Sequence, residues 1–542
     1  MDSKIRGTLG SILIVLLIVQ PLFDVYMAII GESLDIFGIS IVTLLRTTTC
    51  VVLVIMTAIY QIKDRYKLKW LIALVIYLLI VGIYITLHHF NIIQSNGYFI
   101  TQGLYDFGAE LMYVLRLVVP VILIYTVIMI KPNKEQIEKS IISVVFIISL
   151  IIILTNLFKI SYASYSPIND TISYNVFDWF LLSELPYEES LSKGFFVSAN
   201  QIGALLAILL PIVIMYICKH NNVFTYIVLL LGIISMVLIG TRVGTYGFIL
   251  VTIAMCLVVI LITIIKKKRL EYLNIIAIVL IMFAGLILYS KSPAKNRTFI
   301  DSSDDMYSEL IDDVIDTEEC ITLNNFKEML KDEIRIKEYL NYELNDSISG
   351  ETLRYEAMCK YIKENHKYHS ITRKYVMKIY PYEQDPEFWL NLFEQPASVK
   401  GDNRAKQSVI IKHIKELNDN QVYDTLLGMG ATPMNSREYM IENDLISHYY
   451  NIGIIGIILF VAPYAAVIVY VAILVLKDLK YRLTVRLSAY ILSIFMTYGI
   501  GYFAGHVIDE YIVTIYVATI AGLAINHINE ILWGETNERN NA

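Results

Sequence analysis

Apolar runs of about 20 residues recur along the chain, and no other feature constrains its fold as strongly. A helix that crosses a bilayer core of about 30 Å needs runs of this length, because each residue advances the helix by about 1.5 Å. Of the 542 residues, 56% are hydrophobic and 17% are charged, whereas soluble domains carry about 25% charged residues. The net charge of −6 is small for this length and indicates no nucleic-acid partner. The sequence therefore predicts an all-α polytopic membrane protein in a lipid bilayer.

We expect about twelve transmembrane helices, with one long interruption after the ninth. The first run is too long for the apolar region of a signal peptide and has no small-residue cleavage site after it, so it is expected to be a retained span. The expected spans are residues 9–30, 39–60, 69–88, 109–130, 140–158, 196–218, 223–240, 243–265, 271–290, 447–476, 484–506 and 508–530.

Basic residues set the expected orientation, because short cytoplasmic loops are enriched in Lys and Arg. The loops 61–69, 131–139, 266–269 and 477–482 carry Lys and Arg and all fall on one side of the predicted spans. Both termini are therefore expected in the cytoplasm, and residues 291–446 are expected outside it.

The long interruption is expected to be one extracytoplasmic, mainly helical loop. Its acidic stretch 301–319 is more typical of a solvated face or leader than of a cation site. Residues 351–365 and 403–417 carry apolar residues at helical spacing and predict amphipathic helices that lie against the membrane domain. The expected organisation is spans one to nine in 1–290, the loop in 291–446, spans ten to twelve in 447–530 and a cytoplasmic tail in 531–542.

Several ionisable residues fall inside or next to the predicted spans, where charge is costly and usually functional. Arg242 lies at the tight outer turn "IGTRVGTYGF", and Arg46 and Arg116 lie in the outer parts of their spans. A guanidinium offers a rigid fork of donors to phosphate oxygens, so a lipid-linked phosphate is the expected partner. For Arg46 the structural alternative is an ion pair with Asp24. For Arg116 it is an ion pair with Glu110.

Acidic and imidazole side chains gather where the chain re-enters the membrane. Glu442, Asp444 and His448 lie just before and at the start of the tenth span, and in a helix Asp444 and His448 share one face. His506 lies in "GYFAGHVIDEY", at the outer turn between the last two spans. A carboxylate or imidazole at this boundary could act as a general base towards a hydroxyl, and ordinary interfacial polarity is the alternative.

The order of these motifs resembles the O-antigen ligase and O-antigen polymerase family. "GFFVSANQIGALLAILLPI" is similar to the family's span that begins with an Asn, here Asn200, and ends in Leu-Pro. "IGTRVGTYGF" is similar to its Thr-Gly-Ser-Arg-Gly turn, and "LLGMG" with "IENDLISHYYNIGIIGIILF" resembles its re-entry into the membrane. "QPLFDVY" and "FAGH" resemble members thought to make cell-wall and capsular polymers in Gram-positive bacteria. The resemblance spans most of the chain.

The resemblance implies a multi-span glycosyltransferase that needs no metal and no cofactor. It would act outside the bacterial cytoplasmic membrane on sugars carried by undecaprenyl diphosphate. Arg242 matches the turn arginine that would hold the diphosphate. The family's second arginine lies in the outer loop, where Arg404 fits best and Arg354 competes. The remaining expected substrate-binding residues are Arg46, Arg116 and Asn200.

The sequence departs from the family at its His-Asn pair, because Glu442 and Asn443 stand there. The general base is therefore expected to be Glu442 or Asp444, with His448 or His506 as alternatives.

The combined expectation is an extracytoplasmic polymerase that joins undecaprenyl-diphosphate-linked repeat units into a cell-surface polysaccharide. A flippase and a chain-length regulator are candidate partner proteins. Transfer of the glycan to another acceptor, as in a ligase, is the nearest alternative. A transporter or flippase would typically show internal repeats and broken spans in matching halves, which this sequence does not clearly show. A sensor or channel would need no arginine at the outer leaflet.

Overall fold

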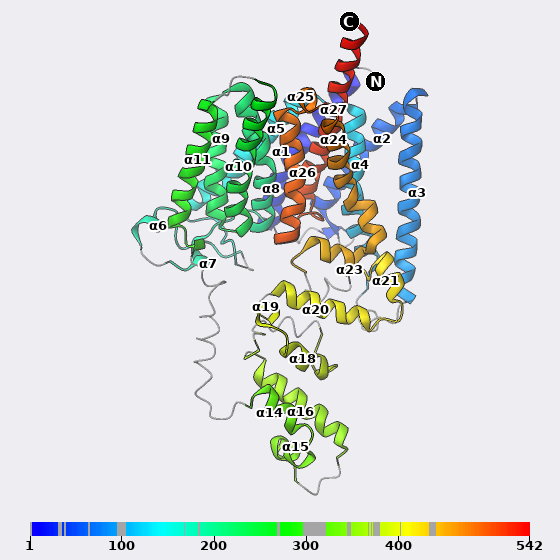
Figure 1. The fold of residues 1–542 in the computed structure, drawn as a ribbon, viewed down its shortest axis with the longest axis vertical. Coiled ribbons are helices and arrows are strands. Elements are labelled where there is room, and N and C mark those ends of the chain that lie inside the picture. Colours follow the sequence, from blue (N-terminus) through cyan, green and yellow to red (C-terminus); the bar gives the residue numbers. More distant parts are fainter. Residues whose placement is uncertain are drawn as a thin grey trace.

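The protein is a bundle of long helices with a smaller set of helices at one end (Figure 1). The computed structural model describes residues 3–30, 35–36, 39–62, 65–94, 105–166, 169–182, 185–267, 272–295, 321–343, 348–366, 368–369, 371, 380–400, 403–432 and 441–541. The acidic stretch 301–319 lies outside these residues.

Among the described residues, 11 helices are long and apolar enough to cross a membrane. Residues 223–240, the seventh expected span, form the shorter helix α9 of 17 residues. The expected all-α polytopic fold is thereby confirmed. The 11 long helices, together with the shorter α9, are α1 (Ser3–Ile30), α2 (Ile41–Ile62), α3 (Arg65–Gln94), α4 (Phe107–Ile130), α5 (Lys134–Leu157), α8 (Ala199–His220), α9 (Val223–Ile239), α10 (Arg242–Ile265), α11 (Tyr272–Lys291), α23 (Asp444–Gly456) continuing through η2 (Ile457–Val461) into α24 (Ala462–Leu476), α26 (Val485–Ala504) and α27 (Tyr511–Asn541).

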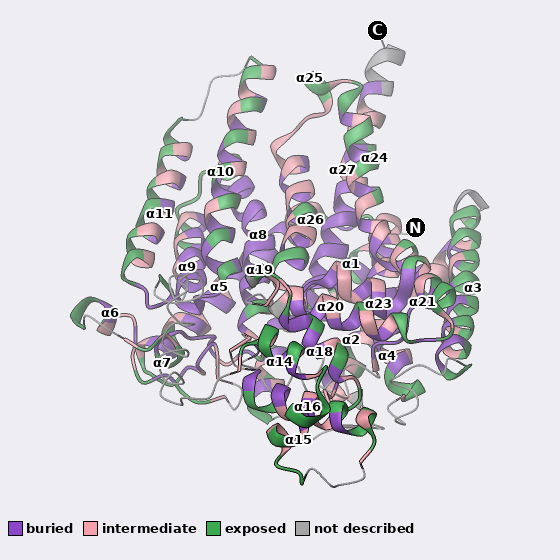
Figure 2. Ribbon diagram, turned by 60° about the horizontal axis from the view of Figure 1, so that its bottom comes forward, coloured by how far each residue is buried: buried purple, intermediate pink, exposed green. Residues whose placement is uncertain are grey.

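Two helices, α8 and α27, form the buried centre of the bundle, while α3 and α11 stand at its edges and expose apolar side chains (Figure 2). Both chain ends lie at the end of the bundle opposite the smaller helices (Figure 1). The remaining short elements of the bundle are the antiparallel pair β1 (Asp35–Ile36) and β2 (Ile39–Ser40), α6 (Asp178–Leu181), α7 (Tyr187–Ser190) and α25 (Leu479–Arg482).

The smaller helices, here called the loop helices, have an apolar core of their own. They are α14 (Leu323–Met329), α15 (Glu333–Leu340), α16 (Gly350–Asn365), α18 (Pro386–Phe393), α19 (Ala397–Lys400), α20 (Asn403–Glu416) and α21 (Gln421–Leu427). Tyr361 of α16 and Trp389 of α18 are fully buried in this core, which continues to Met429 and Tyr450 at the bundle.

The two amphipathic helices expected in the loop are α16 and α20, but only α20 lies next to the bundle (Figure 1). The expectation that α16 lies against the membrane domain is wrong. Its buried face, with Leu353 and Ala357, packs into the core of the loop helices instead. An apolar stripe specifies that a helix face is buried, but not which partner covers it.

Two glycines allow the chain to cross itself where it re-enters the bundle. Gly428 has φ +91° and Gly453 has φ +64° and ψ −176°, so α23 is broken at Gly453. A Cβ on Gly453 would lie 2.5 Å from the Gly428 backbone nitrogen. The crossing is held by hydrogen bonds from the Met429 and Gly430 N–H groups to the carbonyls of Tyr450 and Asn451, at 2.7 and 3.0 Å. Gly428 of "LLGMG" and Gly453 of "GIIG" are therefore required because a larger residue would clash at the crossing.

We predict that Gly453→Ala destabilises the protein by about 3 kcal/mol, because its backbone conformation is nearly restricted to glycine and the added methyl meets the crossing chain. Thermal unfolding of the detergent-solubilised protein checks this. Gly499→Ala in α26 is the matched control, since a Cβ there meets no atom within 4 Å. Equal melting temperatures for the two variants would contradict the steric account.

Candidate functional site

Charged side chains gather at the end of the bundle that meets the loop helices. Arg242 is the first residue of α10 and is exposed. Arg46 lies five residues into α2 and Arg116 nine residues into α4, which places them about 7 Å and about 13 Å along their helices. The three arginines therefore occupy different depths at one end of the bundle.

Arg46 is buried beside unpaired polar groups. Its Nη2 donates to the Gln20 carbonyl oxygen at 3.2 Å, while its Nε and both polar atoms of the Gln20 side chain have no hydrogen-bond partner among the described residues. Asp24 attracts Arg46, but its carboxylate accepts from the Val197 N–H at 2.9 Å. Burial lowers the pKa of Lys193, another cation near Asp24, and Asp24 counteracts this shift. Unpaired buried donors such as these favour an acceptor such as a phosphate oxygen.

Arg116 pairs with a residue that the sequence did not indicate. Its Nη1 lies 3.9 Å from Oε1 of Glu510, and its guanidinium lies 5.8 Å from the ring centre of Tyr113. The alternative ion pair of Arg116 with Glu110 is wrong, because Glu110 is fully committed to other partners. Burial raises the pKa of Glu510 to about 7, with Arg116 acting in the opposite direction.

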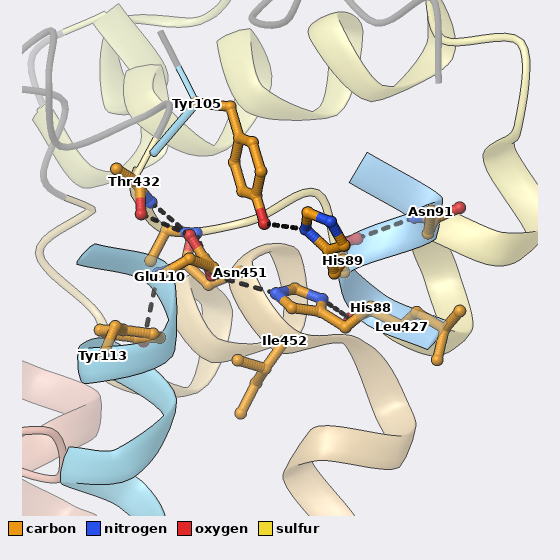
Figure 3. A network of polar contacts seen from close by, with 12 residues as sticks. His88, His89, Asn91, Tyr105, Glu110, Tyr113, Leu427, Thr432, Asn451 and Ile452 are labelled. Carbon is orange, nitrogen blue, oxygen red and sulfur yellow. Dashed lines mark hydrogen bonds and ion pairs between the residues drawn. The ribbon is translucent and has the colours of Figure 1, made fainter. Parts of the chain in front are cut away.

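Glu110 fastens the "LLGMGAT" segment to the bundle (Figure 3). Its carboxylate accepts from the N–H groups of Ala431 and Thr432, at 3.0 and 2.8 Å, and contacts His88 Nε2 at 3.0 Å. His88 Nδ1 lies 2.8 Å from the Leu427 carbonyl oxygen, which can only accept, so Nδ1 carries a proton. His88 therefore links Glu110 to the Leu427 carbonyl of the same segment.

Asp444 fastens the outer turn after α26 to the start of α23. Its carboxylate is 1% exposed and accepts from the N–H groups of His506, Val507 and Ile508, the last two at 2.9 Å. Gly505 and His506 both have positive φ, which turns these successive N–H groups towards one point. Two of the expected catalytic residues, Asp444 and His506, are thus joined through the backbone.

Glu442, the third expected catalytic residue, lies against the same turn. A Cβ on Gly505 would lie 2.9 Å from the Glu442 carbonyl carbon. The Glu442 N–H donates to Gln407 of α20 at 3.1 Å, and its carboxylate lies 3.6 Å from Nε of Arg404. The structure therefore brings a loop helix, the re-entry segment and the last outer turn together.

The two competing loop arginines lie in different places. Arg404 is on α20, next to the bundle, whereas Arg354 is on α16 and lines a cavity among the loop helices farther from it (Figure 1). Of the two, Arg404 is the one in contact with Glu442.

Asn200 and Arg242 lie at the starts of α8 and α10, and both side chains are exposed. The two helices approach closely, because a Cβ on Gly203 would lie 2.9 Å from Oγ1 of Thr241. α26 packs against both helices, so its outer turn lies at the same end of the bundle.

Two side chains near this turn have a buried polar atom without a hydrogen-bond partner among the described residues: His448, which was expected as an alternative base, and Asp509, which was not among the expected site residues. His448 is buried, its Nδ1 lies 3.0 Å from the Tyr113 hydroxyl, and its Nε2 has no partner among the described residues. Oδ1 of Asp509 is also buried without a hydrogen-bond partner in that part of the chain. The i,i+4 spacing of Asp444 and His448 indicated a shared helix face, but only the tertiary fold brings Tyr113 to it.

Asp444, His506 and Asp509 each offer a ligand atom, and these atoms lie within 4.8 Å of one another. The group has the residue types of a divalent-cation site. However, the Asp444 carboxylate already accepts three backbone N–H groups, which compensate its charge.

We predict different stability effects for the two re-entry carboxylates. Asp444→Asn turns an NH2 group towards backbone N–H groups and should cost about 2–3 kcal/mol. Glu442→Gln weakens only a half-exposed pair with Arg404 and should cost less than about 1 kcal/mol. Thermal unfolding in detergent measures both, and a larger loss in Glu442→Gln would refute the anchoring role of Asp444.

The chain matches the family described as O-antigen ligase like membrane protein over residues 7–531. No curated protein and no solved structure gives a match. The family match includes the outer turn and the re-entry segment, and it indicates glycosyltransferase-type chemistry on lipid-linked glycans. The resemblance carried by the motifs is confirmed, and the chain belongs to the O-antigen ligase-like family of multi-pass membrane proteins.

Proposed function

We propose that the protein is a polysaccharide polymerase that acts at the outer face of the bacterial cytoplasmic membrane. It would transfer a glycan from undecaprenyl diphosphate to the end of another lipid-linked repeat unit. The observation that carries this proposal is the meeting of Arg404, Glu442 and the outer turn at one end of a bundle of this family. Both termini then lie in the cytoplasm, at the end opposite the loop helices (Figure 1).

Arginines at three depths suit a lipid-linked diphosphate. Arg242 at the helix end, with Arg116 and Arg46 deeper, would contact the diphosphate while its lipid chain stays in the membrane. Their positive charges would stabilise the negative charge that develops on the leaving diphosphate. Asn200, exposed at the neighbouring helix start, would donate or accept a hydrogen bond at the same surface.

The transfer step requires one base. The acceptor hydroxyl oxygen forms a bond to the anomeric carbon of the donor sugar, and the bond from that carbon to the diphosphate oxygen breaks. The diphosphate keeps the electron pair, and the base takes the hydroxyl proton. Glu442 fits this role best, because its carboxylate is half-exposed and beside Arg404. Asp444 and His506 would then position the turn, with Glu510 as a second carboxylate near Arg116.

A ligase that transfers the glycan to a different acceptor would use the same residues, so the acceptor distinguishes the two. A flippase would deliver the donor, and a chain-length regulator would act on the product.

We predict that Arg242→Ala lowers kcat/KM for joining repeat units by about 100-fold or more, as expected when one group stabilising developing charge is removed. The assay uses full-length protein in nanodiscs with undecaprenyl-diphosphate-linked oligosaccharide, and mass spectrometry of the lipid-linked products. Arg335→Ala, an exposed arginine of α15, is the matched control and should keep wild-type activity.

The same assay can overturn the proposal. Movement of the lipid between leaflets by wild-type protein, with no longer glycan formed, would indicate a transporter. Glycan transfer only to an acceptor without a lipid diphosphate would indicate a ligase.

We also predict that chelation of divalent cations leaves the rate of joining within about twofold of its initial value, because Asp444 is occupied by backbone N–H groups and the arginines supply the positive charge. The rate is measured before and after EDTA, with magnesium added back as the control. A loss restored by the metal would make Asp444, His506 and Asp509 a cation site.

A further inference from the structure

The loop helices form an open cavity of about 690 Å³ that is separate from the site at the bundle. One wall is a face of α16, and the facing wall is the chain that leads into α18. Its volume falls within the range of about 300–1,000 Å³ that is typical of small-molecule sites. The lining has planar polar side chains from Glu351, Arg354, Tyr355, Gln384 and Asp385, and also includes Lys331.

We infer that this cavity is a second glycan-binding site, which holds the polysaccharide as it leaves the site at the bundle. This inference rests on the proposed function.

The lining has the groups that a sugar chain requires. Glu351, Arg354 and Gln384 present planar donors and acceptors, which match pairs of neighbouring hydroxyl groups. Tyr355 is 42% exposed, and its hydroxyl donates to the Glu383 carbonyl oxygen at 2.5 Å, so the ring is held at the cavity. An exposed, fixed aromatic face can stack on the apolar face of a sugar ring.

One acceptor of the cavity is held in place before any ligand binds. Asp385 accepts from the Tyr380 hydroxyl and from His413 Nε2, both at 2.9 Å, and from the Phe388 N–H at 3.0 Å. Burial alone would raise the pKa of Asp385, but these hydrogen bonds hold it below its usual value. The carboxylate is therefore ionised and oriented at neutral pH. It loses little conformational freedom when a ligand binds.

The charges of the lining favour a glycan over an isolated phosphate. Glu351, Asp385 and Glu387 would repel an anion, whereas hydroxyl groups can donate to these carboxylates and accept from Arg354. Among the described residues, the Arg354 guanidinium makes no hydrogen bond or ion pair, so its donors are available to a ligand. Arg354 would thus bind the substrate glycan, but away from the diphosphate.

The position of the cavity indicates product rather than donor. The cavity is lined by α16 and by the start of α18, and α20 lies between these helices and the bundle (Figure 1), so the cavity is farther from the membrane than α20. A chain anchored in the membrane by its lipid can reach this position only after several sugars have been added. The expected consequence is on product length rather than on the first joining step.

The test uses full-length protein in nanodiscs and the double variant Arg354→Ala, Tyr355→Ala, with Arg335→Ala as the control. The binding probe is the oligosaccharide of several repeat units that mild acid releases from the polymer. We expect this probe to bind the double variant about tenfold more weakly than wild type, as for the loss of one stacked ring and one charged contact. Product chains should be shorter, while the rate of joining the first two units stays unchanged.

The outcomes separate this inference from the proposed function. Wild-type protein that binds the probe through Arg354 and Tyr355 but joins no units would overturn the polymerase and keep the glycan site. Equal probe affinity and equal product length in wild type and double variant would overturn the glycan site alone. Loss of the first joining step in the double variant would also overturn the inference of a product-binding site, because the cavity would then be required for the joining reaction itself.

Discussion

Irregular backbone at membrane depth needs hydrogen-bond partners within the protein, and two buried carboxylates supply them here. Asp444 accepts from three consecutive N–H groups of the turn after α26, and Glu110 accepts from Ala431 and Thr432. Each carboxylate joins segments that are far apart in the sequence. Between them, the crossing of Gly428 and Gly453 completes the hydrogen bonds of the re-entry segment. The arrangement of charged groups above this end of the bundle depends on these anchors.

Two arginine–glutamate pairs, one at each end of the bundle, differ in their geometry. Near the loop helices, Arg404 and Glu442 are 3.6 Å apart and partly exposed, and such pairs are worth about 0–1 kcal/mol. At the opposite end, Arg482 forms two short hydrogen bonds with Glu535, at 2.8 and 2.7 Å. A bidentate pair of this kind is stronger and geometrically fixed. A guanidinium in a weak pair can exchange a carboxylate for a phosphate at little cost, so of these two pairs Arg404–Glu442 is the one suited to a changing ligand.

Much of the fold could be predicted from the sequence, because runs of about 20 apolar residues specify spans by length alone. The contacts between segments that are far apart in the sequence could not be predicted in this way. An ion pair of Glu110 with Arg116, six residues away, was the structural alternative to phosphate binding by Arg116, whereas the fold brings His88 and the "LLGMGAT" backbone to Glu110. The choice between Arg404 and Arg354 likewise depended on which loop helix lies next to the bundle. Spacing along one helix gives the shared face of two residues, but not the partner that comes from another helix.

Glu442 and Asn443 stand where the resemblance implies a His-Asn pair, and in the proposed mechanism this difference would change the charge of the base before and after the proton transfer. An imidazole becomes positive when it takes a proton, whereas a carboxylate becomes neutral. In the proposed mechanism a carboxylate base is negative before the proton transfer and neutral after it, so it would attract a neighbouring cation only before the transfer. Arg404, 3.6 Å from Glu442, supplies that cation. In the proposed mechanism, protonation of Glu442 would weaken its attraction for Arg404, and the guanidinium would then turn towards the negative diphosphate as it leaves. The substitution and the neighbouring arginine are thus consistent with one transfer mechanism.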